Sequence, residues 1–213
     1  MISASEALAR LREGNARFAS GAGHIGELIG GRARDELVAG QEPFAVILGC
    51  SDSRVPVEII FDQGLGDLFV IRVAGNIIAP SLVGSVEFAA ARFGTRLVVV
   101  LGHTRCGAVQ TTLEQLLQSG PAQSRNLHSI VERVRPSVET LLEGELRDDH
   151  DELVRRAVRA NVRVSANHLR HGSAILERLI REEGLLVVGA EYALETGRVD
   201  FFDVPATVAV SEV

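Results

Sequence analysis

Four runs of the chain are almost continuously apolar, and Val, Ile and Leu dominate them. Half-buried strands alternate apolar and polar side chains, whereas the strands of a parallel sheet covered on both faces are apolar throughout. The pattern therefore predicts four buried parallel strands: Phe44–Cys50, Leu68–Arg72, Arg96–Gly102 and Leu185–Glu191.

Apolar positions between these runs recur at helical spacing, which predicts helices on both faces of the sheet. The predicted helices cover Leu82–Phe93, Ala108–Ser119, Asp151–Arg170 and Ser173–Glu183. A glycine lies at or near the end of each: Gly94, Gly120, Gly172 and Gly184. Because glycine adopts the left-handed conformation that often ends a helix, we expect that conformation at these positions.

The two ends of the chain add one element each. Leu8, Leu11 and Phe18 predict an amphipathic N-terminal helix that ends near Gly21, and its apolar face packs either on the domain or on a partner subunit. The segment ETGRVDFFD predicts a turn and an antiparallel edge strand. The expected fold class is α/β, with a mostly parallel central sheet of about four parallel strands plus an antiparallel edge strand, flanked by helices.

Length and composition fit one soluble domain over residues 1–213, with residues 1–40 as an N-terminal helical arm. The chain has 213 residues, 46% of them hydrophobic, and a formal net charge of -6 with no lysine. An acidic chain does not favour nucleic-acid binding, which needs clustered basic residues. No apolar segment reaches the ~20 residues that span a bilayer, and the N-terminus lacks the apolar core of a signal peptide, so we expect a cytoplasmic protein.

Two cysteines and one histidine end or follow predicted strands. Cys50 ends the first strand, and His103 and Cys106 follow the third within the segment HTRC. Ligand sites of open parallel sheets lie at the carboxyl ends of the strands, so these side chains can converge there. A Cys2His set is a known open zinc site, with one position left for water or substrate, although a single buried cysteine is more often a small apolar core residue.

Charged residues follow Cys50 directly. Asp52 and Arg54 alternate with serines, so their side chains can point the same way and form an ion pair that keeps the carboxylate ionised. Such a carboxylate can accept a hydrogen bond from a water molecule on zinc or occupy the fourth metal position itself. A purely structural salt bridge is the alternative.

These residues resemble the two metal-ligand motifs of the β-class carbonic anhydrases of bacterial type. The segments CSDSRVP from Cys50 and GHTRCG from Gly102 carry the resemblance, which extends over roughly residues 41–197. It implies zinc held by Cys50, His103 and Cys106, and reversible hydration of CO2 to bicarbonate.

The resemblance also implies roles for other residues. Asp52 and Arg54 would form the catalytic dyad. The substrate site would include Gln41, acting across a dimer interface, the pocket residues Phe69 and Phe88, and Gly107, which permits close backbone approach. We therefore expect a homodimer or a dimer of dimers.

Some members of the family have a closed state in which the equivalent of Asp52 ligates zinc, and acid pH is expected to favour it. In one subgroup bicarbonate stabilises this state through a Trp, an Arg and a Tyr. Arg72 and Tyr192 match the last two, but Ile47 replaces the Trp, which argues against a regulatory bicarbonate site.

Three other functions are alternatives to this one. Hydrolysis of CS2 or COS would use the same zinc centre, and a non-catalytic bicarbonate- or zinc-binding module would not need Asp52, Arg54 and Gln41. A disulfide oxidoreductase is disfavoured because the cysteines lack the Cys-x-x-Cys spacing.

Overall fold

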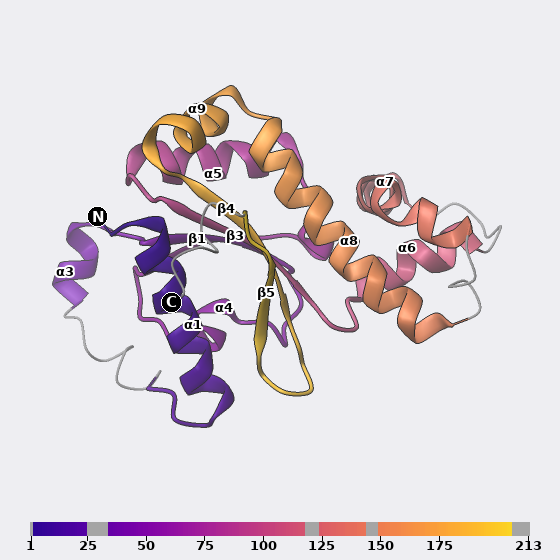
Figure 1. Ribbon diagram of the computed structural model, residues 1–213, viewed down its shortest axis with the longest axis horizontal. Helices are drawn as coiled ribbons and strands as arrows, with labels where there is room; N and C mark the ends of the chain where they lie inside the picture. Colours follow the sequence, from indigo (N-terminus) through magenta and orange to yellow (C-terminus); the bar gives the residue numbers. More distant parts are fainter. Residues whose placement is uncertain (1, 25–33, 118–123, 144–148, 206–213) are drawn as a thin grey trace.

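The computed structural model describes residues 2–24, 34–117, 124–143 and 149–205. A five-stranded sheet with the order β2-β1-β3-β4-β5 forms its centre (Figure 1). The first four strands are parallel, and β5 is antiparallel to β4. The expected sheet is confirmed, with the strands β1 Ala45–Gly49, β2 Leu68–Arg72, β3 Leu97–His103, β4 Leu186–Tyr192 and β5 Val199–Asp203.

The direction of strand addition reverses between β1 and β3. The chain forms β2 on one side of β1 and returns to form β3 on the other side. The register pairs Gly49 with Leu101, so the residues that follow β1 lie next to the last residues of β3. Such a switch point is where open parallel sheets bind ligands.

Helices cover both faces of the sheet. The helices of the described residues are α1 Ala4–Ala19, α3 Arg34–Ala39, α4 Val57–Ile60, α5 Pro80–Arg92, α6 Gly107–Leu117, α7 Arg125–Val138, α8 His150–His171 and α9 Ala174–Glu183, with 3-10 turns η1 Ala74–Asn76 and η2 Glu139–Glu143. Successive strand residues face opposite sides, so Ile47 packs towards α1 and α4 while Leu48 packs towards α5, α8 and α9. A third apolar core, between α6, α7 and the first half of α8, lies next to Cys50 and Cys106.

The predicted helices correspond to α1, α5, α6, α8 and α9, whereas α7 and the short α3 and α4 were not predicted. Pro136 lies inside α7, and proline in a helix interior argues against a helix. The predicted end of α6 at Ser119 lies outside the described residues. No helix in the described part of the chain is long and apolar enough to cross a membrane.

The glycine prediction is right at two positions and wrong at one. Gly94 and Gly184 have φ values of 66° and 69°, as expected. Gly172 ends α8 with a φ of -113°, and a Cβ atom there would lie 2.6 Å from the carbonyl oxygen of His168. Close backbone approach, not a left-handed conformation, requires glycine at this position. Gly120 lies outside the described residues.

The apolar face of α1 packs on the sheet of its own chain. Ala7, Leu8 and Leu11 are buried in the core that contains Ile47. Ser3 begins the helix with a capping box, in which its side chain accepts from the Glu6 amide and the Glu6 carboxylate accepts from the Ser3 amide. Contact of residues 1–40 with a partner subunit stays a prediction, and residues 25–33 lie outside the described part.

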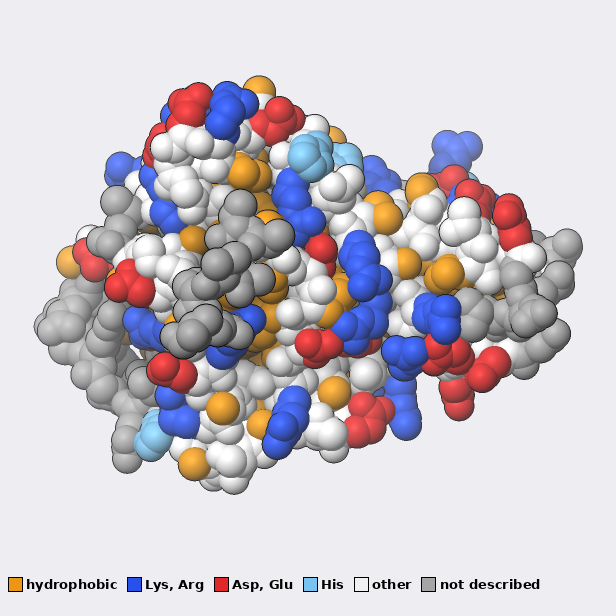
Figure 2. Space-filling model, in the orientation of Figure 1, with side chains coloured by type: hydrophobic (Ala, Val, Ile, Leu, Met, Phe, Trp, Pro, Cys, Tyr) orange, Lys and Arg blue, Asp and Glu red, His pale blue; other side chains and the backbone are white. Residues whose placement is uncertain are grey.

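Arginine side chains lie along the outer side of α8, on the face of the molecule that Figure 2 shows. Acidic residues of β4 and β5 pair with them: Arg159 lies 3.2 Å from Glu191 and 2.7 Å from Asp200, and Arg170 lies 3.0 Å from Asp203. These ion pairs connect the edge strand β5 to α8.

Asp62 connects α1 to the segment after α4. Its buried carboxylate accepts hydrogen bonds from Arg17 Nε and from the His24 amide, both at 2.6 Å. Burial raises the pKa of this carboxyl group, but the hydrogen bonds from Arg17 and His24 outweigh burial, so the pKa is lowered. The φ of 49° at Asp62 is a left-handed conformation that asparagine also tolerates.

We expect Asp62→Asn to lower the free energy of unfolding by ~1–3 kcal/mol at about pH 7, since a charged hydrogen-bond acceptor is lost. The folded-state pKa lies below the unfolded value of ~3.9, so the contribution of the carboxylate is complete above that value and is lost as the pH falls through the folded pKa. Urea denaturation of both proteins at about pH 7 and about pH 3 measures the difference, which should shrink in acid. A difference that is the same at both pH values would contradict this prediction.

Candidate metal centre

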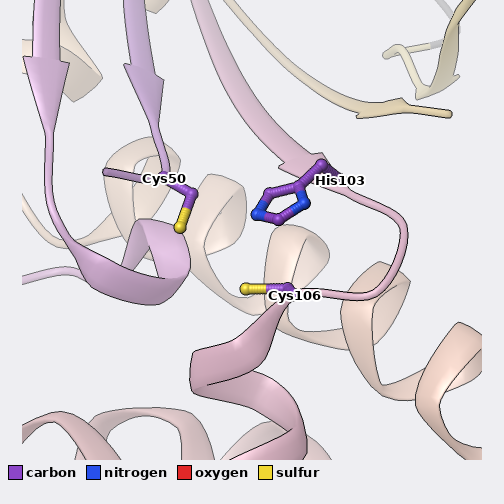
Figure 3. A group of neighbouring side chains, drawn as sticks. All are labelled: Cys50, His103 and Cys106. Carbon is purple, nitrogen blue, oxygen red and sulfur yellow. The ribbon is translucent and has the colours of Figure 1, made fainter. Parts of the chain in front are cut away.

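Three metal-ligating side chains meet at the carboxyl edge of the sheet, at the switch point between β1 and β3. Cys50 directly follows β1, His103 is the last residue of β3, and Cys106 directly precedes α6. Their ligand atoms all lie within 4.8 Å of one another, and Figure 3 shows the two sulfur atoms and the imidazole ring around a common space. The predicted convergence is confirmed.

The imidazole of His103 is arranged as a metal ligand. The side chain is fully buried, and Nδ1 lies 2.9 Å from the carbonyl oxygen of Thr104. A carbonyl only accepts, so Nδ1 carries the proton and Nε2 keeps a free lone pair. Nε2 is buried and has no hydrogen-bond partner among the described residues. An unpaired buried acceptor is costly, and a metal ion would satisfy it.

The two thiols also fit a metal ion. The pKa of Cys50 is lowered, mainly because the Cys106 thiol donates a hydrogen bond to it, and the pKa of Cys106 is raised because it is that donor and is buried. Without a metal, the pair therefore holds one proton and one negative charge. A dication can replace that proton, and a Cys2His set of soft and imidazole ligands suits zinc.

Asp52 and Arg54 form a two-point ion pair beside this centre. Arg54 donates from Nε to Asp52 Oδ1 at 2.9 Å and from Nη2 to Oδ2 at 2.7 Å. These hydrogen bonds hold the pKa of the Asp52 carboxyl group well below its usual range. Asp52 Oδ2 lies 3.8 Å from His103 Nε2, so an ionised acceptor faces the candidate metal position. Asp52 is therefore held by Arg54 in the ion pair that the sequence predicted.

A model of the carbonic anhydrase family matches residues 45–199, a range that contains both ligand segments. The chain belongs to the carbonic anhydrase family. Carbonic anhydrase 2 of Mycobacterium tuberculosis is 43% identical over 189 residues, which are 88% of this chain and 87% of that protein.

Solved structures place this carbonic anhydrase in the β class. The β-carbonic anhydrase CafA of Aspergillus fumigatus has 30% identity and a TM-score of 0.73, over 93% of this chain and 90% of that chain. A tetrameric β-carbonic anhydrase of Sordaria macrospora has 28% identity and a TM-score of 0.71, over 79% of this chain and 85% of that chain.

In this carbonic anhydrase Arg72 supports the loop that carries Cys50. It donates to the carbonyl oxygens of Cys50 and Asp52 at 3.0 and 2.5 Å. Tyr192, the other residue of the expected regulatory site, is buried on β4, where its ring lies 6.4 Å from that of Phe18. Strands β1 and β3 separate β2 from β4, and no described contact joins Arg72 to Tyr192. The two residues lie on strands that are not neighbours, and the regulatory site stays a prediction.

Some of the expected substrate residues lie near the carboxyl ends of the strands, and the others lie near the amino ends. Gly107 begins α6 next to Cys106, and no atom lies within 4 Å of the position of a Cβ atom there. Gln41 precedes β1 and Phe69 pairs with Val46 near the start of β2, at the edge away from Cys50. Phe88 is 52% exposed on α5, with its ring 6.1 Å from that of Phe69. Within one chain, Gln41, Phe69 and Phe88 therefore lie away from the metal centre.

The turn between His103 and Cys106 is held by the segment after β4, which the sequence did not indicate. Thr104 Oγ1 donates to Glu195 Oε2 at 2.9 Å and accepts from the Leu194 amide at 3.0 Å. Arg105 has a φ of 56° and pairs with Glu195 at 3.0 Å. Glu195 lies 91 residues after Thr104 in the chain, so no local pattern could have shown these contacts.

We expect Thr104→Val, which keeps the side-chain shape, to lower the free energy of unfolding of the metal-free protein by ~1–3 kcal/mol, since two hydrogen bonds are lost. Urea denaturation measures this change. Thr140→Val, at an exposed position in η2, is the matched control and should unfold like the parent protein. Equal stability of Thr104→Val and the parent would show that these bonds do not hold the turn.

Proposed function

We propose that Cys50, His103 and Cys106 hold a zinc ion, and that the reversible hydration of CO2 to bicarbonate and a proton takes place beside it. The observation that carries the proposal is the buried Nε2 atom of His103, which has no hydrogen-bond partner in the described part of the chain and lies beside two cysteine sulfur atoms. A bound zinc ion supplies a Lewis acid that lowers the pKa of water towards neutrality.

Asp52 is proposed to orient the attacking water molecule. Arg54 holds the carboxylate ionised, so Asp52 accepts a hydrogen bond and cannot donate one. A water molecule that donates to Asp52 keeps a lone pair free for the carbon atom of CO2. Because the pKa of Asp52 is far below neutrality, the proton leaves for solvent and does not remain on the carboxylate.

A second copy of the chain is proposed to complete the substrate site. Gln41 and Phe93 line one cavity of about 470 Å³, and the rings of Phe93 and Phe88 lie 5.6 Å apart, so Gln41 and the aromatic group occupy one region. Phe88 leaves a large apolar surface exposed in the single chain. Apolar and aromatic side chains suit CO2, which is uncharged, and a partner subunit would place them at the neighbouring metal centre.

The metal ligands are tested with Cys106→Ser. We expect the parent protein to bind zinc in close to equimolar amount and to hydrate CO2 in stopped-flow assays, faster as the pH rises from ~6.5 to ~9 through the ~7 expected for activated water. The variant should lose both zinc and activity, because a serine hydroxyl stays protonated and is a poor zinc ligand. Zinc retained by the variant, or no hydration by zinc-loaded parent protein at any pH, would contradict the proposal.

The role of Asp52 is tested with Asp52→Asn, which keeps the shape but removes the negative charge. We expect kcat/KM for CO2 hydration to fall about 100-fold with zinc content unchanged, in the range for loss of a group that handles a proton in the transition state. Asp151→Asn, at an exposed position in the first turn of α8, is the matched control and should keep the parent activity. Equal activity of Asp52→Asn and the parent would show that Asp52 does not orient the nucleophile.

A further inference from the structure

The sulfur atom of Cys50 accepts a hydrogen bond from a distant turn. The amide of Gly75, in η1, donates to Cys50 Sγ at 3.3 Å. Gly75 is buried and has a φ of 72°, which only glycine adopts readily. A Cβ atom there would also lie 3.1 Å from the Cβ atom of Ala108 in α6. Glycine at this position thus lets the backbone approach the metal centre closely. The same residue type has many accessible backbone conformations, so the turn needs other contacts to fix it.

Helix α8 restricts this turn through two buried side chains. Asn161 Nδ2 donates to the carbonyl oxygen of Gly75 at 2.7 Å, and Ser165 Oγ donates to the carbonyl oxygen of Asn76 at 3.1 Å. The two residues are four apart, so they lie on one face of α8. Asn161 is only 1% exposed. Its side-chain amide binds the carbonyl group of Gly75, and the N–H group of Gly75 binds Cys50. Gly75 is therefore held from both sides.

The second cysteine does not need such support. Cys106 directly precedes α6, and the backbone amides of Val109 and Ala108 in the first turn of that helix partly offset the rise in the pKa of its thiol. These amides are fixed by the helix itself. The amide at Cys50 instead comes from a segment 25 residues away, and its direction depends on the contact with α8.

We propose that Asn161 is a positioning residue: it holds the Gly75 carbonyl so that the Gly75 amide stays directed at Cys50 Sγ and limits electron donation from that sulfur to the metal. The proposal rests on the metal centre proposed above. A hydrogen bond to a thiolate withdraws electron density from the sulfur, and partners of ligands commonly change metal affinity when they are replaced. A merely structural asparagine would stabilise the packing of α8 and leave the sulfur unaffected.

The test uses cobalt(II) added to the metal-free full chain, because thiolate-to-cobalt charge transfer absorbs light and reports directly on the sulfur atoms. Asn161→Leu has a similar size and no donor. We expect its charge-transfer band at longer wavelength than that of the parent, since a sulfur without the N–H bond is more easily oxidised. We also expect ~10–100-fold weaker cobalt binding in competition with a chelator, because Cys50 is no longer held in position by the Gly75 turn, and this loss outweighs the stronger electron donation of the sulfur. Asn167→Leu, an exposed position on the same helix, is the matched control.

The outcomes separate the two proposals. A folded Asn161→Leu protein with the parent band and affinity would overturn the role of Asn161, even if its melting temperature falls. A parent protein that binds no cobalt and no zinc would overturn the metal centre itself, and the role of Asn161 with it. If Asn161→Leu does not fold by circular dichroism, Asn161→Ala, which introduces no bulk, is judged by the same band and affinity.

Discussion

The parallel pairing of β1 with β3 is the constraint on which the metal centre depends. Both strands end at the same edge of the sheet, and the reversal of strand order between them leaves that edge free of a crossing connection. Cys50 and His103 are thus brought together by the register of two central buried strands. A slip of the pairing by one residue would turn one ligand to the opposite face, so the apolar packing on both faces also fixes the metal geometry.

Two turns at the metal centre are held by distant parts of the chain: η1, whose amide donates to Cys50, and the turn between His103 and Cys106. Gly75 and Arg105 both have positive φ values. Helix α8 holds the first turn through Asn161, and Glu195 after β4 contacts the second turn. Strain near a binding site persists only when the surroundings determine it, and here the surrounding elements are those that also form the third apolar core and the edge strand.

The sequence predicted what depends on local pattern. Continuous apolar runs indicated the parallel strands, and the position of Cys50, His103 and Cys106 at strand ends indicated their convergence. The alternation of Asp52 and Arg54 likewise indicated the ion pair. Helix α7 was missed because Pro136 and a polar composition obscure it. Contacts such as Asn161 with Gly75 join residues 86 apart through a buried amide, and buried amides have no sequence signal of their own.

The expected site residues lie at opposite ends of the strands, so a complete substrate site would need a second subunit. The three candidate metal ligands and the Asp52–Arg54 ion pair lie at the carboxyl ends of the strands, whereas Gln41 and the exposed Phe88 lie towards their amino ends. A single chain therefore has a nucleophile site without the apolar residues that the family resemblance assigns to CO2. If those residues act on CO2, they must do so in the site of another subunit, and a monomer would retain zinc but bind the substrate poorly. Under the proposed function, metal binding depends on the fold of one chain, and substrate binding depends on a second subunit.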